Sequence, residues 1–182
     1  DKKDAIAKVL ELVEENSVVG FGGSITIQDL DILKELKDKK NCTILDWINA
    51  NSKEEGYELR RDNFKSDVFL ASSNAITQNG ELINIDGNGN RVAAITFGPN
   101  KVIIIAGKNK IVKNKEEGIT RIKEIAAPLN AKRLNKKTPC VNTGKCMDCN
   151  SPEKICCTTV IHGWQLRKGR INVIIIDEEL GY

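Results

Sequence analysis

The sequence has no apolar run of the roughly 18 residues that a membrane-spanning helix needs. Its apolar stretches, such as 102–106 and 173–176, have the length of a strand. No cationic and apolar leader of a secreted protein opens the chain. An excess of one charge is also missing, because 28 basic and 25 acidic residues give a net charge of only +3. We therefore expect a cytoplasmic protein that binds neither membranes nor nucleic acids.

Apolar residues make up 40% and charged residues 29% of the 182 residues, as in a chain that folds around a core. Strand-length apolar runs alternate with segments whose apolar residues have helical spacing. This alternation predicts an α/β fold with a mostly parallel sheet, helices on both faces, and a single domain over 1–182. The predicted strands are 17–21, 42–48, 67–73, 101–106 and 170–176. The predicted helices are 4–13, 26–36, 53–64, 91–97 and 116–129.

Turn signals mark the middle of the chain. The β-prone runs 75–77 and 82–85 are separated by Gln78-Asn79-Gly80-Glu81. Asn-Gly tolerates the positive φ of a tight turn, so this segment predicts a hairpin. Asn90 is placed to cap the helix that follows, and Gly98-Pro99 is a typical end for it.

Two glycine-rich loops, Gly20–Ser24 and Asp86–Asn90, each follow a predicted strand and precede a predicted helix. Helix N-termini attract anions, and glycines let the backbone approach a ligand closely. Loops at the carboxyl ends of parallel strands converge on one crevice, which Ser72-Ser73-Asn74 should also face. Either loop could be a turn that binds nothing, but together they favour one site for a small anionic metabolite. The candidate ligand-binding residues are Gly22, Gly23, Ser24, Ser73, Asn74, Gly87, Asn88, Gly89 and Asn90.

Neither loop matches a nucleotide fingerprint. Gly20-Phe21-Gly22-Gly23-Ser24 lacks the third spaced glycine of a dinucleotide site and the Gly-Lys-Ser/Thr of a P-loop. The sequence has no nicotinamide or flavin fingerprint and no paired nucleophile and base. We interpret its single histidine, His162, as structural.

Five of the six cysteines fall in the polar segment 131–159, which we interpret as an insertion in the domain. Their spacing is Cys140-x5-Cys146-x2-Cys149-x6-Cys156-Cys157. Four thiolates can bind zinc or an iron–sulfur cluster, and metal binding could supply the folding energy of this segment. A disulfide switch or inert thiols are the alternatives. The predicted metal ligands are Cys140, Cys146, Cys149 and Cys156, with Cys157 spare.

A pattern of four segments runs along the chain. They are Val19-Gly20-Phe21-Gly22-Gly23-Ser24, Ser66-Asp67-Val68-Phe69-Leu70, Asn74-Ala75-Ile76-Thr77-Gln78-Asn79-Gly80-Glu81-Leu82 and Asp86-Gly87-Asn88-Gly89-Asn90-Arg91-Val92-Ala93-Ala94. The pattern resembles the lactate-utilisation (LUD) domain family. This resemblance implies a fold similar to that of sugar-phosphate isomerases and coenzyme A transferases, and further residues ahead of Asp1. It also implies a role in oxidising L-lactate or a related 2-hydroxy acid, beside iron–sulfur oxidoreductase subunits.

The resemblance leaves the metal and the chemistry open. A link to lactate favours a [4Fe–4S] cluster, whereas the absence of a Cys-x2-Cys-x2-Cys run favours zinc. Asn74 stands where isomerases of similar fold often have an aspartate, which leaves Glu81 and Asp86 as candidate catalytic carboxylates. The alternatives are a non-catalytic module that binds a regulatory metabolite and holds a structural zinc, and an isomerase or acyl-CoA transferase.

Overall fold

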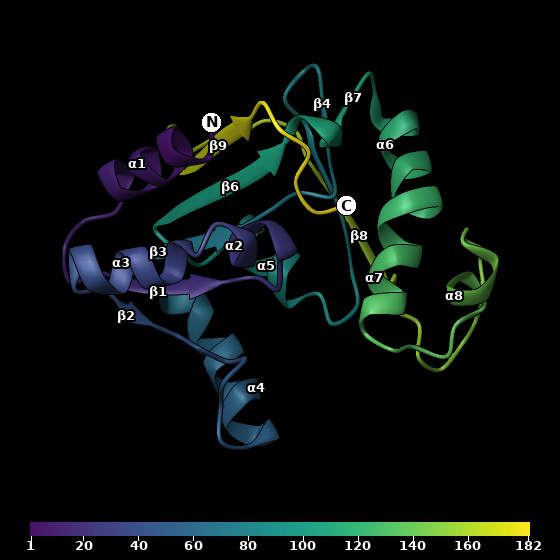
Figure 1. Cartoon of the computed structure of the whole chain (residues 1–182), viewed down its shortest axis with the longest axis horizontal. Coiled ribbons are helices and arrows are strands. Elements are labelled where there is room, and N and C mark those ends of the chain that lie inside the picture. Colours follow the sequence, from purple (N-terminus) through teal and green to yellow (C-terminus); the bar gives the residue numbers. More distant parts are fainter. The chain divides into compact units, whose positions relative to one another are not determined.

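Two units make up the chain in the computed structural model, which describes residues 1–182 (Figure 1). Unit 1 comprises residues 1–72, 93–108 and 165–181, and unit 2 comprises residues 73–92, 109–164 and 182. The chain therefore passes between the units several times. That the chain forms a single domain stays a prediction.

A five-stranded, fully parallel sheet forms the centre of unit 1, in the order β2-β1-β3-β6-β9. The strands are β1 Val18–Phe21, β2 Thr43–Ile44, β3 Val68–Ala71, β6 Lys101–Gly107 and β9 Ile171–Ile176. Every residue of β3 is buried, as expected for a central parallel strand that is covered on both faces. The predicted α/β fold with a mostly parallel sheet is confirmed.

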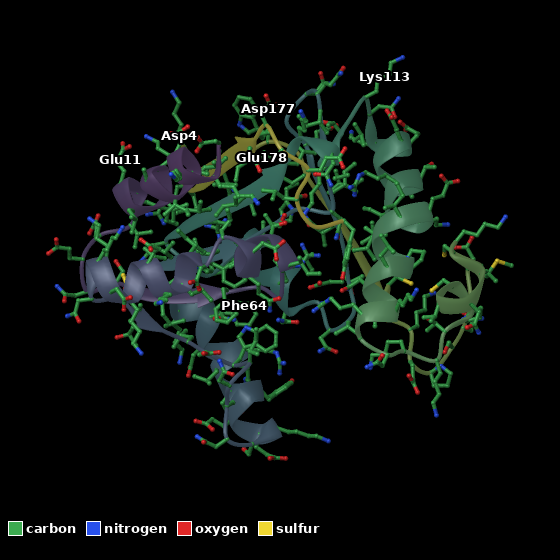
Figure 2. All side chains as sticks on the ribbon, viewed as in Figure 1. Asp4, Glu11, Phe64, Lys113, Asp177 and Glu178 are labelled. Carbon is green, nitrogen blue, oxygen red and sulfur yellow. The ribbon has the colours of Figure 1, made fainter.

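Three helices of unit 1, α1 Lys2–Leu12, α2 Ile25–Asp29 and α3 Ile32–Lys40, bury apolar side chains in its core. Helix α4 Lys53–Asp62 is mostly exposed. The 3₁₀ helix η1 Asn63–Lys65 follows α4, and η2 Lys108–Lys110 begins in unit 1 and ends in unit 2. Val9 of α1 and Leu36 of α3 join Leu70 of β3 in one core. Ion pairs join Lys2 to Glu178 and Lys108 to Asp177 at the surface; both acids are labelled in Figure 2. None of the helices is both long and apolar enough to cross a membrane.

Two predictions in the first third of the chain are wrong. The predicted helix 26–36 is two helices, because Asp31 takes a left-handed conformation with φ +51° between them. The predicted strand 42–48 is only the two residues of β2, and Trp47 instead turns back to donate its Nε1–H to the carbonyl of Phe21.

A tight reversal leads from α5, Asn90–Thr96, into β6. Gly98 has φ +115° there, and a Cβ at this position would lie 2.6 Å from the backbone oxygen of Phe64, which is labelled in Figure 2. The buried Arg170 side chain donates to the carbonyls of Ala94, Ile95 and Pro99 around the same reversal. The predicted helix and its end at Gly98-Pro99 are therefore confirmed.

Unit 2 contains a second, mixed sheet in the order β7-β4-β5-β8. The strands are β4 Ala75–Thr77, β5 Leu82–Asp86, β7 Ile111–Val112 and β8 Thr158–His162. β4 and β5 pair antiparallel around Gly80, which has φ +86°, so the predicted hairpin is confirmed. His162 ends β8 opposite Leu82.

One long helical segment packs on the second sheet (Figure 1). It consists of α6 Lys115–Arg121, the π-helical turn η3 Ile122–Ala126 and α7 Ala127–Arg133, and α8 Pro139–Thr143 follows. Gly118 is where the helix approaches the sheet, since a Cβ there would lie 2.3 Å from Cδ1 of Ile83. The predicted helix 116–129 is confirmed, with the π turn as an unpredicted feature.

Candidate functional site

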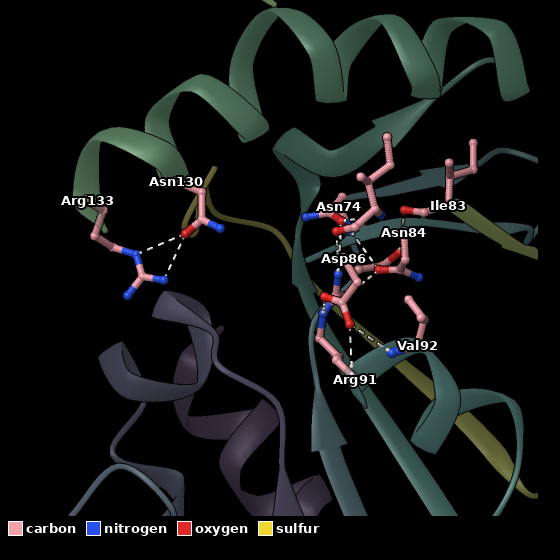
Figure 3. A network of polar contacts seen from close by, with 10 residues as sticks. Asn74, Ile83, Asn84, Asp86, Arg91, Val92, Asn130 and Arg133 are labelled. Atoms are coloured by element: carbon pink, nitrogen blue, oxygen red, sulfur yellow. Dashed lines mark hydrogen bonds and ion pairs between the residues drawn. The ribbon is translucent and has the colours of Figure 1, made fainter. Parts of the chain in front are cut away.

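A buried polar network joins Asn74 to β5 and Arg91 within unit 2 (Figure 3). The side-chain oxygen of Asn74 accepts from the Ile85 N–H at 2.9 Å and from Arg91 Nη2 at 3.1 Å. The oxygen of Asn84 accepts from the Asn74 N–H at 3.2 Å and from Arg91 Nη1 at 2.5 Å. One guanidinium thus holds both amides, and a backbone N–H group, that of Ile85 or of Asn74, holds each of them as well.

Asp86 connects this network to the start of α5. Its Oδ2 accepts from the backbone N–H groups of Arg91 and Val92, and its Oδ1 lies 3.2 Å from Arg91 Nε. A carboxylate at a helix N-terminus satisfies free N–H groups and offsets their positive charge. The helix prediction was right, but the predicted cap was wrong. α5 already begins at Asn90, and Asp86 supplies the side-chain acceptor.

Two more cations lie beside the network. Arg121 donates to the carbonyls of Asn74, at 2.7 Å, and Asn109, at 2.9 Å. Lys110 is only 4% exposed. Burial, with the neighbouring charges of Arg121 and Arg91, lowers the pKa of Lys110 to about 7. We call Arg91, Lys110 and Arg121 the basic cluster.

The pKa of Lys110 has a measurable effect on stability. The unfolded chain keeps the lysine charged up to about pH 10, so between about pH 7 and pH 10 it binds up to one more proton than the folded chain. Stability should therefore rise with pH in this window, by at most about 1.4 kcal/mol per pH unit, and should not gain from this group below pH 7. The free energy of unfolding, measured by urea denaturation at several pH values in this window, should rise less steeply with pH for Lys110→Met than for the wild type.

Lys113→Met is the matched control for this measurement, because Lys113 is an exposed lysine three residues away (Figure 2). It should keep the wild-type slope. Other titrating groups contribute equally to all three proteins, so the difference between the slopes isolates Lys110. Equal slopes for Lys110→Met and the wild type would contradict the lowered pKa.

Four of the clustered cysteines line one cavity of unit 2: Cys140, Cys146, Cys149 and Cys156. These are the four predicted metal ligands. Cys157, predicted to be spare, is exposed and is not part of the lining; its thiol is 3.4 Å from the carbonyl of Lys154. Burial raises the pKa of the Cys156 thiol; Lys154 lowers it, and the Cys146 and Cys149 thiols raise it.

Backbone contacts fix the cysteine segment at both ends. The Cys146 N–H donates to the carbonyl of Lys123 in the π turn at 2.9 Å, and the Cys157 N–H donates to the carbonyl of Asp86 at 2.9 Å. The Lys123 ammonium also pairs with Asp148 at 2.7 Å. The segment 131–159 is therefore attached both to the helix and to β5.

The family model that describes the LUD domain matches residues 1–176, which is nearly the whole chain. The chain belongs to the LUD domain family. The resemblance seen in the sequence is thereby confirmed, and this LUD protein is of the lactate-utilisation type. Among curated proteins, none matches it.

Solved structures similar to this LUD protein share its α/β fold only in part. Ribose 5-phosphate isomerase from Plasmodium falciparum is 20% identical, with a TM-score of 0.39 over 62% of this chain and 52% of that one. eIF2B delta from Chaetomium thermophilum is 17% identical, with a TM-score of 0.42 over 65% and 50%. Translation initiation factor eIF-2B from Pyrococcus horikoshii is 16% identical, with a TM-score of 0.43 over 64% and 49%. The LUD protein thus spans about half of each of these chains.

The two glycine loops of the LUD protein do not end strands of the same sheet. Gly22, Gly23 and Ser24 follow β1 of the parallel sheet, whereas the loop Gly87–Asn90 follows β5 of the mixed sheet. That part of the prediction is wrong because β5 does not join the parallel sheet. It pairs with β4 and β8 in the second sheet. The loops lie in different units, so their shared crevice stays a prediction.

The polar groups of the first loop, Gly20–Ser24, make hydrogen bonds within unit 1. The Gly22 N–H donates to the carbonyl of Leu70 at 2.9 Å, and the Ser24 hydroxyl accepts from the Ile27 N–H at 3.4 Å as the cap of α2. Gly23 lies against the ring of Trp47. Each of these contacts stabilises the turn itself.

The second loop and Ser73 also contact other residues of unit 2. A Cβ on Gly87 would lie 3.5 Å from the backbone of Ile155, so the loop contacts the cysteine segment. Gly89 has φ +78°, and Asn88 is exposed. The buried Ser73 hydroxyl donates to the carbonyl of Ala75 at 2.8 Å. Of the predicted ligand-binding residues, only Asn74 belongs to the polar network.

The candidate carboxylates Glu81 and Asp86 both have cationic partners. Glu81 pairs with Lys115 at 2.8 Å and accepts from the Thr77 hydroxyl at 3.1 Å; the hydrogen bond from Lys115 lowers the pKa of Glu81. Asp86 is held by Arg91. Their catalytic role stays a prediction.

Sequence reasoning missed Asn84, Lys110 and Arg121. An available signal was the polar Asn84 inside the apolar run 82–85, since a buried strand amide needs partners. Lys110 and Arg121 belong to the lysine-rich stretch 108–123, and no local pattern marks which of its cations are buried.

Proposed function

We propose that this LUD protein binds a small organic carboxylate in unit 2 and thereby supports the oxidation of lactate or a related 2-hydroxy acid. The observation that carries the proposal is the basic cluster of Arg91, Lys110 and Arg121 beside Asn74.

The contacts of the two arginines differ in charge. Asp86 pairs with Arg91, but Arg121 donates to two backbone carbonyls, which carry no net charge. Burial places Lys110 in a medium of low dielectric, where a nearby anion gains more than it would in water. Arginine offers a planar fork of donors that suits a carboxylate. A small carboxylate would therefore compensate the charge of the cluster.

A buried donor in the network points the same way. Asn84 is completely buried, and its Nδ2 has no hydrogen-bond partner, although its oxygen accepts twice. Leaving a buried donor without a hydrogen bond costs about 1–3 kcal/mol. A 2-hydroxy acid has carboxylate and hydroxyl oxygens that could accept from it.

Oxidation of a 2-hydroxy acid to a 2-oxo acid removes two electrons and two protons, so an electron acceptor is required. In this proposal the chain binds and orients the acid, and an iron–sulfur oxidoreductase subunit accepts the electrons. Because Glu81 and Asp86 are both ion-paired, a module that binds the metabolite without converting it is the second candidate.

Titration calorimetry of the full chain with lactate, pyruvate and the neutral analogue lactamide tests the binding. We expect both carboxylates to bind and lactamide not to bind. Lys110→Met should weaken carboxylate binding roughly tenfold or more, as expected for a lost hydrogen bond to a charged group. Lys113→Met should bind like the wild type. Affinity should fall as the pH rises above about 7, where Lys110 loses its proton.

Absence of carboxylate binding, or equal binding of lactamide, would overturn the proposal. The two candidate functions are separated by adding an artificial electron acceptor to the same protein with lactate. Formation of pyruvate supports a direct role in oxidation, whereas binding without turnover supports the metabolite-binding module.

A further inference from the structure

The cysteine cavity is built by three separate parts of the segment between α7 and β8. Cys140 lies in α8, Cys146 and Cys149 lie in the turn that follows, and Cys156 immediately precedes β8. The rest of the lining includes the apolar side chains of Ala127 and Met147. Four thiols facing one largely apolar cavity are the donor set of a soft metal centre.

The Cys146-Met147-Asp148-Cys149 turn has the local geometry of a metal-binding turn. Asp148 has φ +46°, and its N–H points to Cys146 Sγ at 3.4 Å. An N–H donor stabilises the charge of a thiolate that binds metal, and hydrogen bonds to the sulfurs are typical of such centres. The Cys146 thiol also donates to Asp148 Oδ1 at 3.8 Å, and the Lys123 ammonium, 2.7 Å from the same oxygen, offsets the charge of that carboxylate.

The cavity is better suited to a cluster than to a single ion. Zinc bonds of about 2.3 Å hold four sulfurs within roughly 4 Å of one another. As they stand, no three cysteine, histidine or carboxylate side chains form a group that could hold one metal ion. The four cysteines nevertheless line one cavity. A cubane of iron and sulfide keeps its thiolates further apart, because each one binds a different iron atom.

We propose that Cys140, Cys146, Cys149 and Cys156 bind a [4Fe–4S] cluster in this cavity, and that Cys157 is not a ligand. The site does not depend on the carboxylate proposed above. The cluster would also fix the segment 131–159, whose backbone donates hydrogen bonds to the carbonyls of Lys123 and Asp86.

The test uses the full chain, purified without oxygen and, in a second sample, reconstituted with ferrous iron and sulfide. We expect iron and acid-labile sulfide in equal amounts, and a broad visible absorption that is lost on reduction. One zinc ion per chain and no sulfide would overturn the cluster. Failure to retain any metal in either sample would overturn the site altogether.

Single alanine variants test the assignment of the ligands. Cys146→Ala, Cys149→Ala and Cys156→Ala should each lower the iron content roughly tenfold or more, because losing a ligand costs at least as much as losing an outer-shell contact. Cys157→Ala is the matched control, since it removes the neighbouring thiol, and it should keep the wild-type content. Far-ultraviolet circular dichroism of the metal-free proteins verifies that each variant is folded. Loss of iron in Cys157→Ala, with retention in Cys156→Ala, would refute the fourth ligand.

Discussion

Replacing Arg91 with methionine should lower the free energy of unfolding by about 3–5 kcal/mol, because it removes one partner of a buried ion pair. The carboxylate of Asp86 would lose its cation, and the oxygens of Asn74 and Asn84 would each lose a donor. Methionine fills a similar volume, so the loss reports the polar contacts rather than a cavity. Carboxylate binding should be lost in the same variant.

Equilibrium urea unfolding measures this effect, and Arg133→Met is the matched control. Arg133 is an exposed arginine that donates to the side chain of Asn130 (Figure 3). Its replacement should change stability by no more than about 0.5 kcal/mol. Arg91→Lys should fall in between, because it keeps the charge without the planar fork. If Arg91→Met were as stable as Arg133→Met, the network would not stabilise unit 2.

Gly98→Ala should lower the free energy of unfolding by about 2–4 kcal/mol. Two costs add at this position. Alanine is strained at φ +115°, and its Cβ would lie 2.6 Å from the Phe64 carbonyl oxygen, which is part of the backbone and cannot rotate away. The chain would have to shift where α5 turns into β6.

Gly169→Ala separates these two costs. Gly169 also belongs to unit 1 and has a positive φ of +77°, but nothing lies within 4 Å of a Cβ built there. Its replacement should cost only the conformational strain, about 1–2 kcal/mol. Thermal or urea unfolding of both variants gives the difference, which we assign to the contact with Phe64. Equal losses in both variants would show that this contact is relieved at no cost.

The elements that depend on short-range patterns could be predicted from the sequence. The strands β1, β3 and β6 are apolar runs that are mostly buried, and β9 is an apolar run at the edge of the sheet. The turn at Asn79-Gly80 forms a hairpin because those residues accept a positive φ. Cys157, which the sequence analysis sets apart as spare, lies outside the cavity lining. That it binds no metal stays a prediction.

What depends on contacts between distant residues could not be predicted. The left-handed Asp31 breaks a regular helical pattern without any glycine or proline to announce it. The hairpin predicts that β5 pairs with β4, but no local pattern shows that β5 also pairs with the distant strand β8 in a second sheet. The basic cluster brings together Arg91, Lys110 and Arg121 from three different elements, α5, η2 and α6, and no local pattern marks them as neighbours.

The position of β9 in the sheet has a consequence for how the protein is made. β9 pairs with β6 along its whole length, yet it is the last strand to leave the ribosome. All of unit 2 except its final residue has been synthesised by then. Domains generally fold as units during translation, but the sheet of unit 1 is complete only when β9 has followed residues 109–164 of unit 2. Until then β6 has a free edge, which makes premature termination downstream of residue 107 a route to aggregation.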